Sequence, residues 1–104
     1  MRGDIHPLKP RDRRGRVQAD PRYAVSLLGD RLSWLSVWVV APTSRSARAA
    51  AYRPPIVVNG EQTRVLVEQL AAVDLRRLGP AVGRLSYDEI THVNRALTFV
   101  LGLL

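Results

Sequence analysis

Residues 22 to 45 read RYAVSLLGDRLSWLSVWVVAPTSR, and two apolar runs in this stretch decide the class of fold. The runs, residues 22–29 and 34–42, are rich in Val, Leu, Trp and Tyr, and Gly29-Asp30-Arg31 lies between them. Side chains of this kind favour strands, and a short connection containing glycine favours a turn. The stretch therefore predicts two neighbouring strands.

The polar ends of these two runs give the first indication of chemistry. Arg22 stands at the head of the first run, and Thr43 follows the second. A guanidinium offers paired N–H donors that match a phosphate, and a hydroxyl adds a neutral donor. An arginine and a hydroxyl at the ends of neighbouring strands could hold one phosphate, which favours nucleic-acid chemistry.

A second pair of strands is expected downstream, around an Asn-Gly dipeptide. In PPIVVNGEQTRVLVEQL, residues 54–70, the runs IVV and RVLVEQL flank Asn59-Gly60. Asn-Gly suits the type I′ turn of tight hairpins, so we expect a hairpin here. LRRLG at 75–79 predicts one helical turn closed by glycine, and the small, basic, unpatterned residues 44–55 predict a loop.

The two ends of the chain complete the expected elements. RGDIHPL, residues 2–8, predicts a short strand, at the edge of a sheet because Pro7 cannot donate to a ladder. Residues 9–21 carry five basic side chains, two prolines and one glycine, which favours a loop. At the other end, Ser86 and Glu89 match a capping box. Apolar residues then recur at helical spacing, at Ile90, Val93, Leu97, Val100 and Leu104, which predicts a helix with one buried face.

The composition limits the class of protein. With 104 residues and 46% apolar content, we expect a single domain, residues 1–104, with one core. The absence of cysteine excludes a disulfide framework, a thiolate nucleophile and a Cys-based zinc site, and it fits a reducing cytoplasm. Neither a signal-peptide pattern nor an 18-residue apolar span is found, so we expect a soluble cytoplasmic protein without a membrane partner.

The charge is the sharpest property of the whole chain. A net charge of +7 and a pI near 11.2 attract polyanions, and 15 of the 16 basic residues are arginine. The codon usage of a GC-rich genome explains the Arg:Lys ratio but not the net charge. Arginines at positions 11, 13, 14 and 16 are either phosphate contacts or a solvated run, and both can be true.

Other groups of residues have structural interpretations. His6 and His92 stand far apart with no carboxylate at metal-ligand spacing, so no metal site is expected. Asp88 opens the terminal helix, where negative charge is favoured, so it is expected to cap the helix rather than to catalyse. Trp34 and Trp38 have an even spacing on one predicted strand, which favours the core or a dimer interface over base stacking.

Several short motifs occur in order along the chain: RGDI at 2–5, Gln18 four residues before Arg22, APTSR at 41–45, VEQL at 67–70, then LRRLG and ALTFVLGLL. Together, over essentially the whole chain, they resemble the MazF/PemK family of toxin endoribonucleases. The resemblance implies a mainly β fold, a small SH3-like antiparallel β-barrel of the PemK/CcdB type, with a C-terminal α-helix. It also implies a homodimer, an acidic antitoxin, and cleavage of single-stranded RNA without a metal or other cofactor, which arrests translation.

The resemblance also carries roles to single residues. Arg22 stands where the family has its catalytic arginine, Thr43 where it has its catalytic threonine, and Gln69 where it has a glutamine near the RNA groove. The remaining candidate RNA contacts are Arg13, Arg14, Arg16, Gln18 and Arg45. The chain departs from the family at Tyr23, commonly proline, at Gly15-Arg16-Val17, commonly Gly-Ser-Glu, and at His6, commonly aromatic.

Cleavage of RNA without a metal uses the ribose 2′-hydroxyl as nucleophile and leaves a 2′,3′-cyclic phosphate and a 5′-hydroxyl. Arg22 keeps its proton at neutral pH, so we expect it to stabilise charge, while water or His6 moves the proton. Two alternatives stay open. One is a toxin-fold module that binds nucleic acid or protein, as toxins against a topoisomerase do, without cutting RNA. The other is a small basic structural protein of chromosomes or ribosomes.

Overall fold

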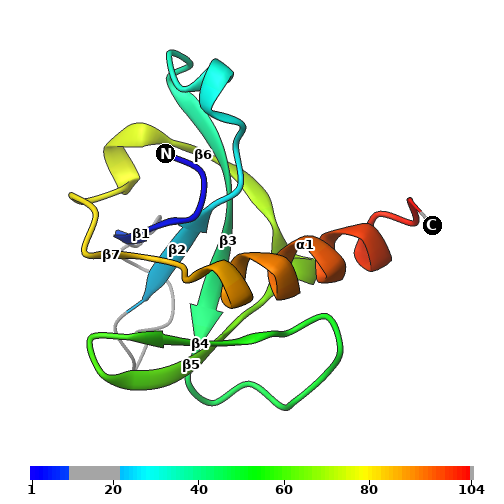
Figure 1. Cartoon of the computed structure of the whole chain (residues 1–104). Helices are drawn as coiled ribbons and strands as arrows, with labels where there is room; N and C mark the ends of the chain where they lie inside the picture. The colour runs from blue at the N-terminus through cyan, green and yellow to red at the C-terminus, as the bar shows by residue number, and fades with distance from the viewer. Residues whose placement is uncertain (10–21, 104) are drawn as a thin grey trace, which may run out of the picture.

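The computed structural model describes residues 1–9 and 22–103, and in them a seven-stranded antiparallel sheet curls into a barrel-like body crossed by one helix (Figure 1). The strand order is β4-β5-β3-β2-β1-β7, and β6 also pairs with β3. The strands are β1 (Asp4–Pro7), β2 (Tyr23–Ser26), β3 (Val37–Ser44), β4 (Pro55–Val58), β5 (Glu61–Val65), β6 (Ala71–Asp74) and β7 (Gly83–Arg84). The helix is α1 (Tyr87–Val100), and 3₁₀ turns are η1 (Asp30–Leu32), η2 (Val67–Gln69) and η3 (Leu75–Arg77). The predicted mainly β fold with a C-terminal helix is confirmed.

β3 is the centre of the sheet because it pairs with three strands. Its first half lies beside β6, from Val37 opposite Asp74 to Val40 opposite Ala71. Its last two residues lie beside β5 instead, and β2 covers its middle from the other side. This change of partner along one strand bends the sheet towards a barrel. It also brings the ends of β2, β3 and β5 to one place.

The expected strand pair at 22–42 forms, but its second strand begins at Val37 rather than at residue 34. Trp34 lies before the strand and is 76% exposed, whereas Trp38 is half-buried and its indole N–H donates to Leu35 O. The prediction that both tryptophans share one strand face is therefore wrong. η1 (Asp30–Leu32) and the turn closed by the hydrogen bond from Leu35 N to Leu32 O occupy the residues between the two strands. β3 therefore starts only at Val37.

The N-terminal strand forms, but the edge position predicted from Pro7 is wrong, because β7 pairs with β1 on its outer side. Asp4 lies opposite Arg84 and Ile5 opposite Gly83. Pro7 is tolerated there because only its carbonyl is used, accepting a hydrogen bond from Gly79 N at 2.9 Å.

The Asn-Gly hairpin is confirmed. Asn59 and Gly60 have φ values of 51° and 81°, as a type I′ turn requires. The second strand ends at Val65, not at residue 70, because Leu66 N donates to Pro42 O and the chain then turns into η2. The helical turn predicted at 75–79 is present as η3, and residues 45–54 form the expected loop.

α1 begins with the predicted capping box: Ser86 Oγ accepts from Glu89 N, and Glu89 Oε1 accepts from Ser86 N. The second carboxylate oxygen of Glu89 accepts from Val57 N on β4 at 2.9 Å. Val93 is buried in the main core, with Ile90, Leu97 and Val100 packed against it, whereas Leu104 lies outside the described residues. The predicted buried face is thus confirmed for the part that the structure describes.

Apolar residues gather on both faces of the sheet. The main core lies between the sheet and α1 and includes Ile5, Val25, Ala41, Ile56, Val65, Val67 and Val93. A smaller cluster on the other face joins Ala24, Val40 and Val73 to Leu8, Trp38 and Leu78. None of the helices that the structure describes has the length and apolar character needed to span a bilayer.

Candidate active site at the ends of β2 and β3

Arg22 and Thr43 lie at the same end of two adjacent strands. The register of β2 and β3 places Ala24 opposite Pro42, and its continuation puts Tyr23 opposite Thr43 and Arg22 opposite Ser44. Arg22 is half-buried, and its carbonyl accepts from Leu8 N at 3.0 Å, which fixes its backbone beside β1. The two residues are one position out of register, so their side chains leave the sheet on opposite faces and can meet only around the ends of the strands.

Thr43 forms the floor of this region rather than its rim, because it is only 3% exposed. It lies opposite Val65 of β5. Side chains that lie opposite each other, or two residues apart on one strand, share a face, so Thr43, Val65 and Thr63 share one face of the sheet. Arg45 directly follows the end of β3. With Tyr23 across from Thr43, this face presents two hydroxyl groups and a phenol.

A small hollow opens on this face, lined by Tyr23, Arg45, Val58, Glu61 and Thr63. Arg45 Nη1 lies 3.2 Å from Glu61 Oε1, and both side chains are substantially exposed. Asn59 Nδ2 of the hairpin turn donates to the Tyr23 hydroxyl at 3.5 Å. The hollow is therefore bordered by an ion pair on one side and by the turn of the hairpin on the other.

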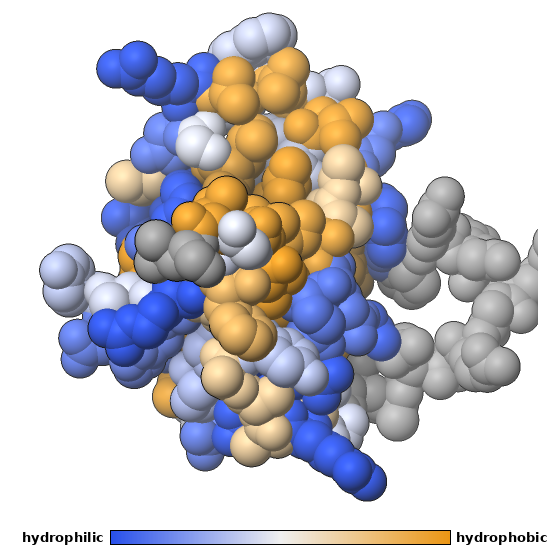
Figure 2. Space-filling model, turned by 90° about the vertical axis from the view of Figure 1, so that its right-hand side faces the viewer, coloured by the Kyte–Doolittle hydropathy of each residue, from blue (hydrophilic) through white to orange (hydrophobic). Residues whose placement is uncertain are grey.

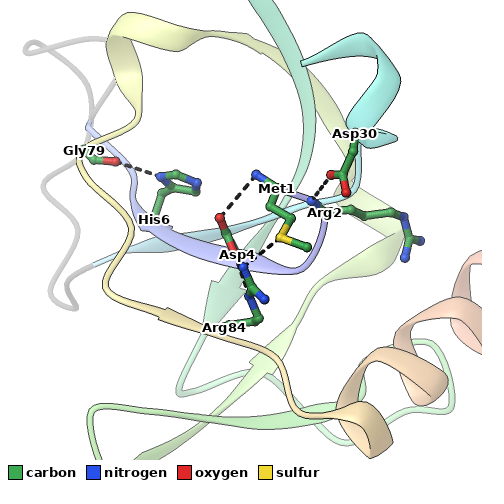
Figure 3. A network of polar contacts seen from close by, with 7 residues as sticks. All are labelled: Met1, Arg2, Asp4, His6, Asp30, Gly79 and Arg84. Atoms are coloured by element: carbon green, nitrogen blue, oxygen red, sulfur yellow. Dashed lines mark hydrogen bonds and ion pairs between the residues drawn. The ribbon is translucent and has the colours of Figure 1, made fainter.

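His6 is held on the opposite face of the sheet. Its Nδ1 lies 2.8 Å from Gly79 O, and because a carbonyl only accepts, Nδ1 carries the proton (Figure 3). The ring meets Trp38 edge to face with centroids 6.0 Å apart, and Nε2 is buried without a partner among the described residues. β2 separates β1 from β3, so two strand spacings, roughly 10 Å, lie between the backbones of His6 and Thr43. The structure does not bring His6 to Thr43.

The RGD motif at the N-terminus fastens β1 rather than joining the site. Asp4 accepts from the N-terminal ammonium at 3.2 Å and from Arg84 Nε at 3.1 Å, and Arg84 Nη2 also contacts Met1 Sδ (Figure 3). Burial alone would raise the pKa of Asp4, but the hydrogen bonds and charges of these two cations together lower the pKa below its ordinary value. Arg2 N donates to Asp30 Oδ1 at 2.7 Å.

Gln69 lies in η2 and is exposed. Its backbone N–H donates to Leu66 O, and Leu66 N donates to Pro42 O, the residue before Thr43. Gln69 is thus one 3₁₀ turn away from the strand ends. Arg13, Arg14, Arg16 and Gln18, the other predicted RNA contacts, lie outside the described residues.

Sequence reasoning missed the ion pair between Arg53 and Glu68, which ties the 45–54 loop to η2. Arg53 Nε and Nη2 donate to Glu68 Oε2 at 2.9 and 2.7 Å, and Tyr52 stacks on Phe99 of α1 with centroids 6.3 Å apart. Burial alone would raise the pKa of Glu68. The hydrogen bonds and charge of Arg53, together with smaller hydrogen-bond contributions, lower this pKa below its ordinary value. No spacing in the sequence relates these residues, because their pairing depends on how η2 packs.

Thr63, Glu61 and Tyr23 were also not recognised as neighbours. The Asn-Gly turn determines which β4 residue faces Thr63, but the pairing of β5 with β3 is a long-range contact without a local signal. Among residues 1–9 and 22–103, no group of three or more His, Cys, Asp or Glu side chains is placed to hold a metal ion.

Comparison with known proteins places the chain among toxins. The model of the family described as PemK-like, MazF-like toxin of type II toxin-antitoxin system matches residues 1–101. Rv3098A, a toxin candidate of Mycobacterium tuberculosis, is 36% identical over 105 residues, which covers 99% of this chain and 98% of the relative.

Two solved structures share the fold at low sequence identity. A mycobacterial endoribonuclease in complex with its cognate antitoxin has a TM-score of 0.81 at 13% identity, covering 100% of this chain and 96% of its own. The Mycobacterium tuberculosis toxin MazF-mt6 has a TM-score of 0.78 at 16% identity, covering 95% of this chain and 96% of its own. The whole described chain, helix included, therefore has the architecture of these toxins.

Proposed function

Because the chain belongs to the PemK-like, MazF-like toxin family of type II toxin-antitoxin systems, we propose that it is a sequence-selective endoribonuclease that cuts single-stranded RNA without a metal. The observation that carries the proposal is the placement of Arg22 and Thr43 at the same end of adjacent strands. Cutting of cellular RNA by such an enzyme arrests translation and growth.

In the proposed reaction the ribose 2′-oxygen attacks the adjacent phosphorus, and the bond from phosphorus to the 5′-oxygen breaks. The products are a 2′,3′-cyclic phosphate and a 5′-hydroxyl, so the proton lost by the 2′-hydroxyl is balanced by one gained by the leaving oxygen. Arg22 stabilises the charge on the non-bridging oxygens with its N–H donors, and Thr43 adds a neutral donor from the floor. With β2 between His6 and Thr43, water is the better candidate for moving the proton.

The test is cleavage of a single-stranded RNA by the purified protein in EDTA, with analysis of the product ends. Arg22→Ala should lower the rate on the order of 10²-fold or more, the loss expected when a main oxyanion donor is removed. Arg76→Ala is the matched control, because Arg76 is 90% exposed and lies away from the candidate site. It follows β6, and Asp74 of β6 pairs with Val37 at the start of β3, the end opposite to Thr43. One deoxynucleotide at the scissile position should abolish cutting.

Two results would contradict this proposal. Full activity of Arg22→Ala would remove the assigned role of the arginine. Binding of RNA without any products from the wild-type protein would favour the alternative, a toxin-fold module that does not cut.

Two partners follow from the same proposal. The first is an acidic antitoxin whose disordered segment competes with RNA for the basic surface. The second is another copy of the chain. Figure 2 shows apolar side chains gathered on the side where α1 ends, and the exposed residues of that end include Phe99, Leu101 and Leu103. A patch of this kind on a small protein is typical of an interface, and sedimentation of the purified toxin measures the oligomeric state.

A further inference from the structure

The hollow between Tyr23 and Thr63 has an unusual wall. Thr63 lines it, is 5% exposed, and its hydroxyl oxygen has no hydrogen-bond partner among the described residues. A buried hydroxyl without a partner costs free energy, and valine has nearly the same shape without that cost. Folding alone therefore gives no reason for threonine at a position opposite Ile56 in the hairpin.

The size of the hollow limits what can enter it. Its volume is about 10 Å³, close to the smallest space that holds one water molecule. A complete nucleobase does not fit, but one exocyclic oxygen or amino group of a base has about the size of a water. The Thr63 hydroxyl both donates and accepts, so it can pair with either group.

The border of the hollow offers the rest of a nucleotide site. The Tyr23 ring forms one wall, and its hydroxyl is steadied by Asn59 of the turn. Arg45 stands at the border with Glu61, and its side chain is 40% exposed and that of Glu61 66% exposed. An exposed pair of this kind contributes little to stability, so an RNA phosphate can replace Glu61 on Arg45 at small cost.

We propose that this hollow is a base-reading subsite of the RNA groove, in which Thr63 hydrogen-bonds one exocyclic oxygen or amino group while Arg45 holds the phosphate of the same nucleotide. The proposal rests on the proposed function, because Thr43, the assigned catalytic donor, shares this face of the sheet. Thr63 is a specificity residue and does not touch the scissile bond. Tyr23 lines the same hollow and gives the subsite one wall.

The experiment compares cleavage of a randomised single-stranded RNA pool by the wild type, Thr63→Val and Thr63→Ser, with the 5′-hydroxyl ends sequenced. Thr63→Val should lose its preference at one position of the cleavage motif, by roughly tenfold or more, while the other positions stay selective. Its melting temperature should rise, because the unpartnered hydroxyl is gone. Thr63→Ser keeps the hydroxyl and should retain the motif.

An unchanged motif in Thr63→Val, with normal cutting by the wild type, would overturn the subsite and leave the endoribonuclease intact. The same loss of preference in Thr63→Ser would also overturn it, since packing rather than the hydroxyl would then set the preference. A wild-type protein that leaves the whole pool uncut would instead reject the proposed function itself.

Discussion

The polar groups around β1 and those at the ends of β3 and β5 differ in their hydrogen-bond and ion-pair partners. Around β1, Asp4 accepts from two cations and His6 is fixed by Gly79, so the polar groups fasten the chain to itself. At the ends of β3 and β5, the Thr63 hydroxyl has no partner among the described residues, and Arg45 forms an ion pair with the exposed Glu61. The comparison teaches that the ion pairs of Asp4 serve stability, whereas the Thr63 hydroxyl, which borders a hollow, is available to a ligand.

The largest effect on this comparison should come from Thr43→Val. The change keeps the shape of the floor and removes one donor to the phosphate, so RNA cleavage should fall on the order of 10²-fold in rate. The melting temperature should stay close to that of the wild type, measured by circular dichroism. Thr98→Val, which removes a hydroxyl that donates to Asn94 O within α1, is the control and should cut RNA normally. Unimpaired cutting by Thr43→Val would remove the threonine from the reaction.

A smaller effect, on stability rather than on RNA cleavage, is expected from Gly3→Ala on the β1 side. Gly3 has a φ of +91°, and a Cβ there would lie 3.0 Å from Ile90 Cδ1. Both strain and crowding lower the free energy of unfolding, by about 1–3 kcal/mol. Chemical denaturation measures it, and cleavage at a temperature well below melting should be unchanged. Gly29→Ala is the matched control, because its Cβ would meet nothing within 4 Å and its φ is −61°. Equal stability of the two variants would contradict the strain.

The smallest effect is expected from Asp4→Asn, and it should depend on pH. The two cations lower the pKa of Asp4 in the folded state, so its contribution to stability is present at neutral pH and is lost as the pH falls through the folded-state pKa, which lies below the ordinary value. The cations of both ion pairs are exposed to solvent, so each pair contributes about 0.5 kcal/mol. Asp4→Asn should therefore be slightly less stable than the wild type at pH 7, and the difference should shrink towards pH 3. A difference that is constant over this range would show that the charge of Asp4 is not the cause.

Local patterns in the sequence predicted the elements that depend on local chemistry. The capping box placed the start of α1, and Asn59-Gly60 placed the hairpin turn. The patterns failed where a tertiary contact decides: β7 covers β1 despite Pro7, and β5 ends where Leu66 bonds to Pro42. A single sequence carries no record of these pairings.

The candidate site divides in the same way. The pair Arg22 and Thr43 could be proposed from two strand ends and a family resemblance. The position of Tyr23 beside Glu61 and Thr63 could not, because β2 and β5 become neighbours only through their register with β3. Whether Arg13, Arg14, Arg16 and Gln18 contact RNA stays a prediction, since they lie outside the described residues.

Glu89 has a consequence for the solubility of this toxin. β4 stands at one end of the strand order, where unpaired backbone groups invite the addition of a strand from another molecule. One carboxylate oxygen of Glu89 accepts a hydrogen bond from Val57 N on that strand, while the other accepts from Ser86 N and caps α1. The residue that starts the helix thus also blocks the outer strand with a negative charge. Once the helix is docked on the sheet, this contact protects the outer strand against edge-to-edge pairing with another molecule.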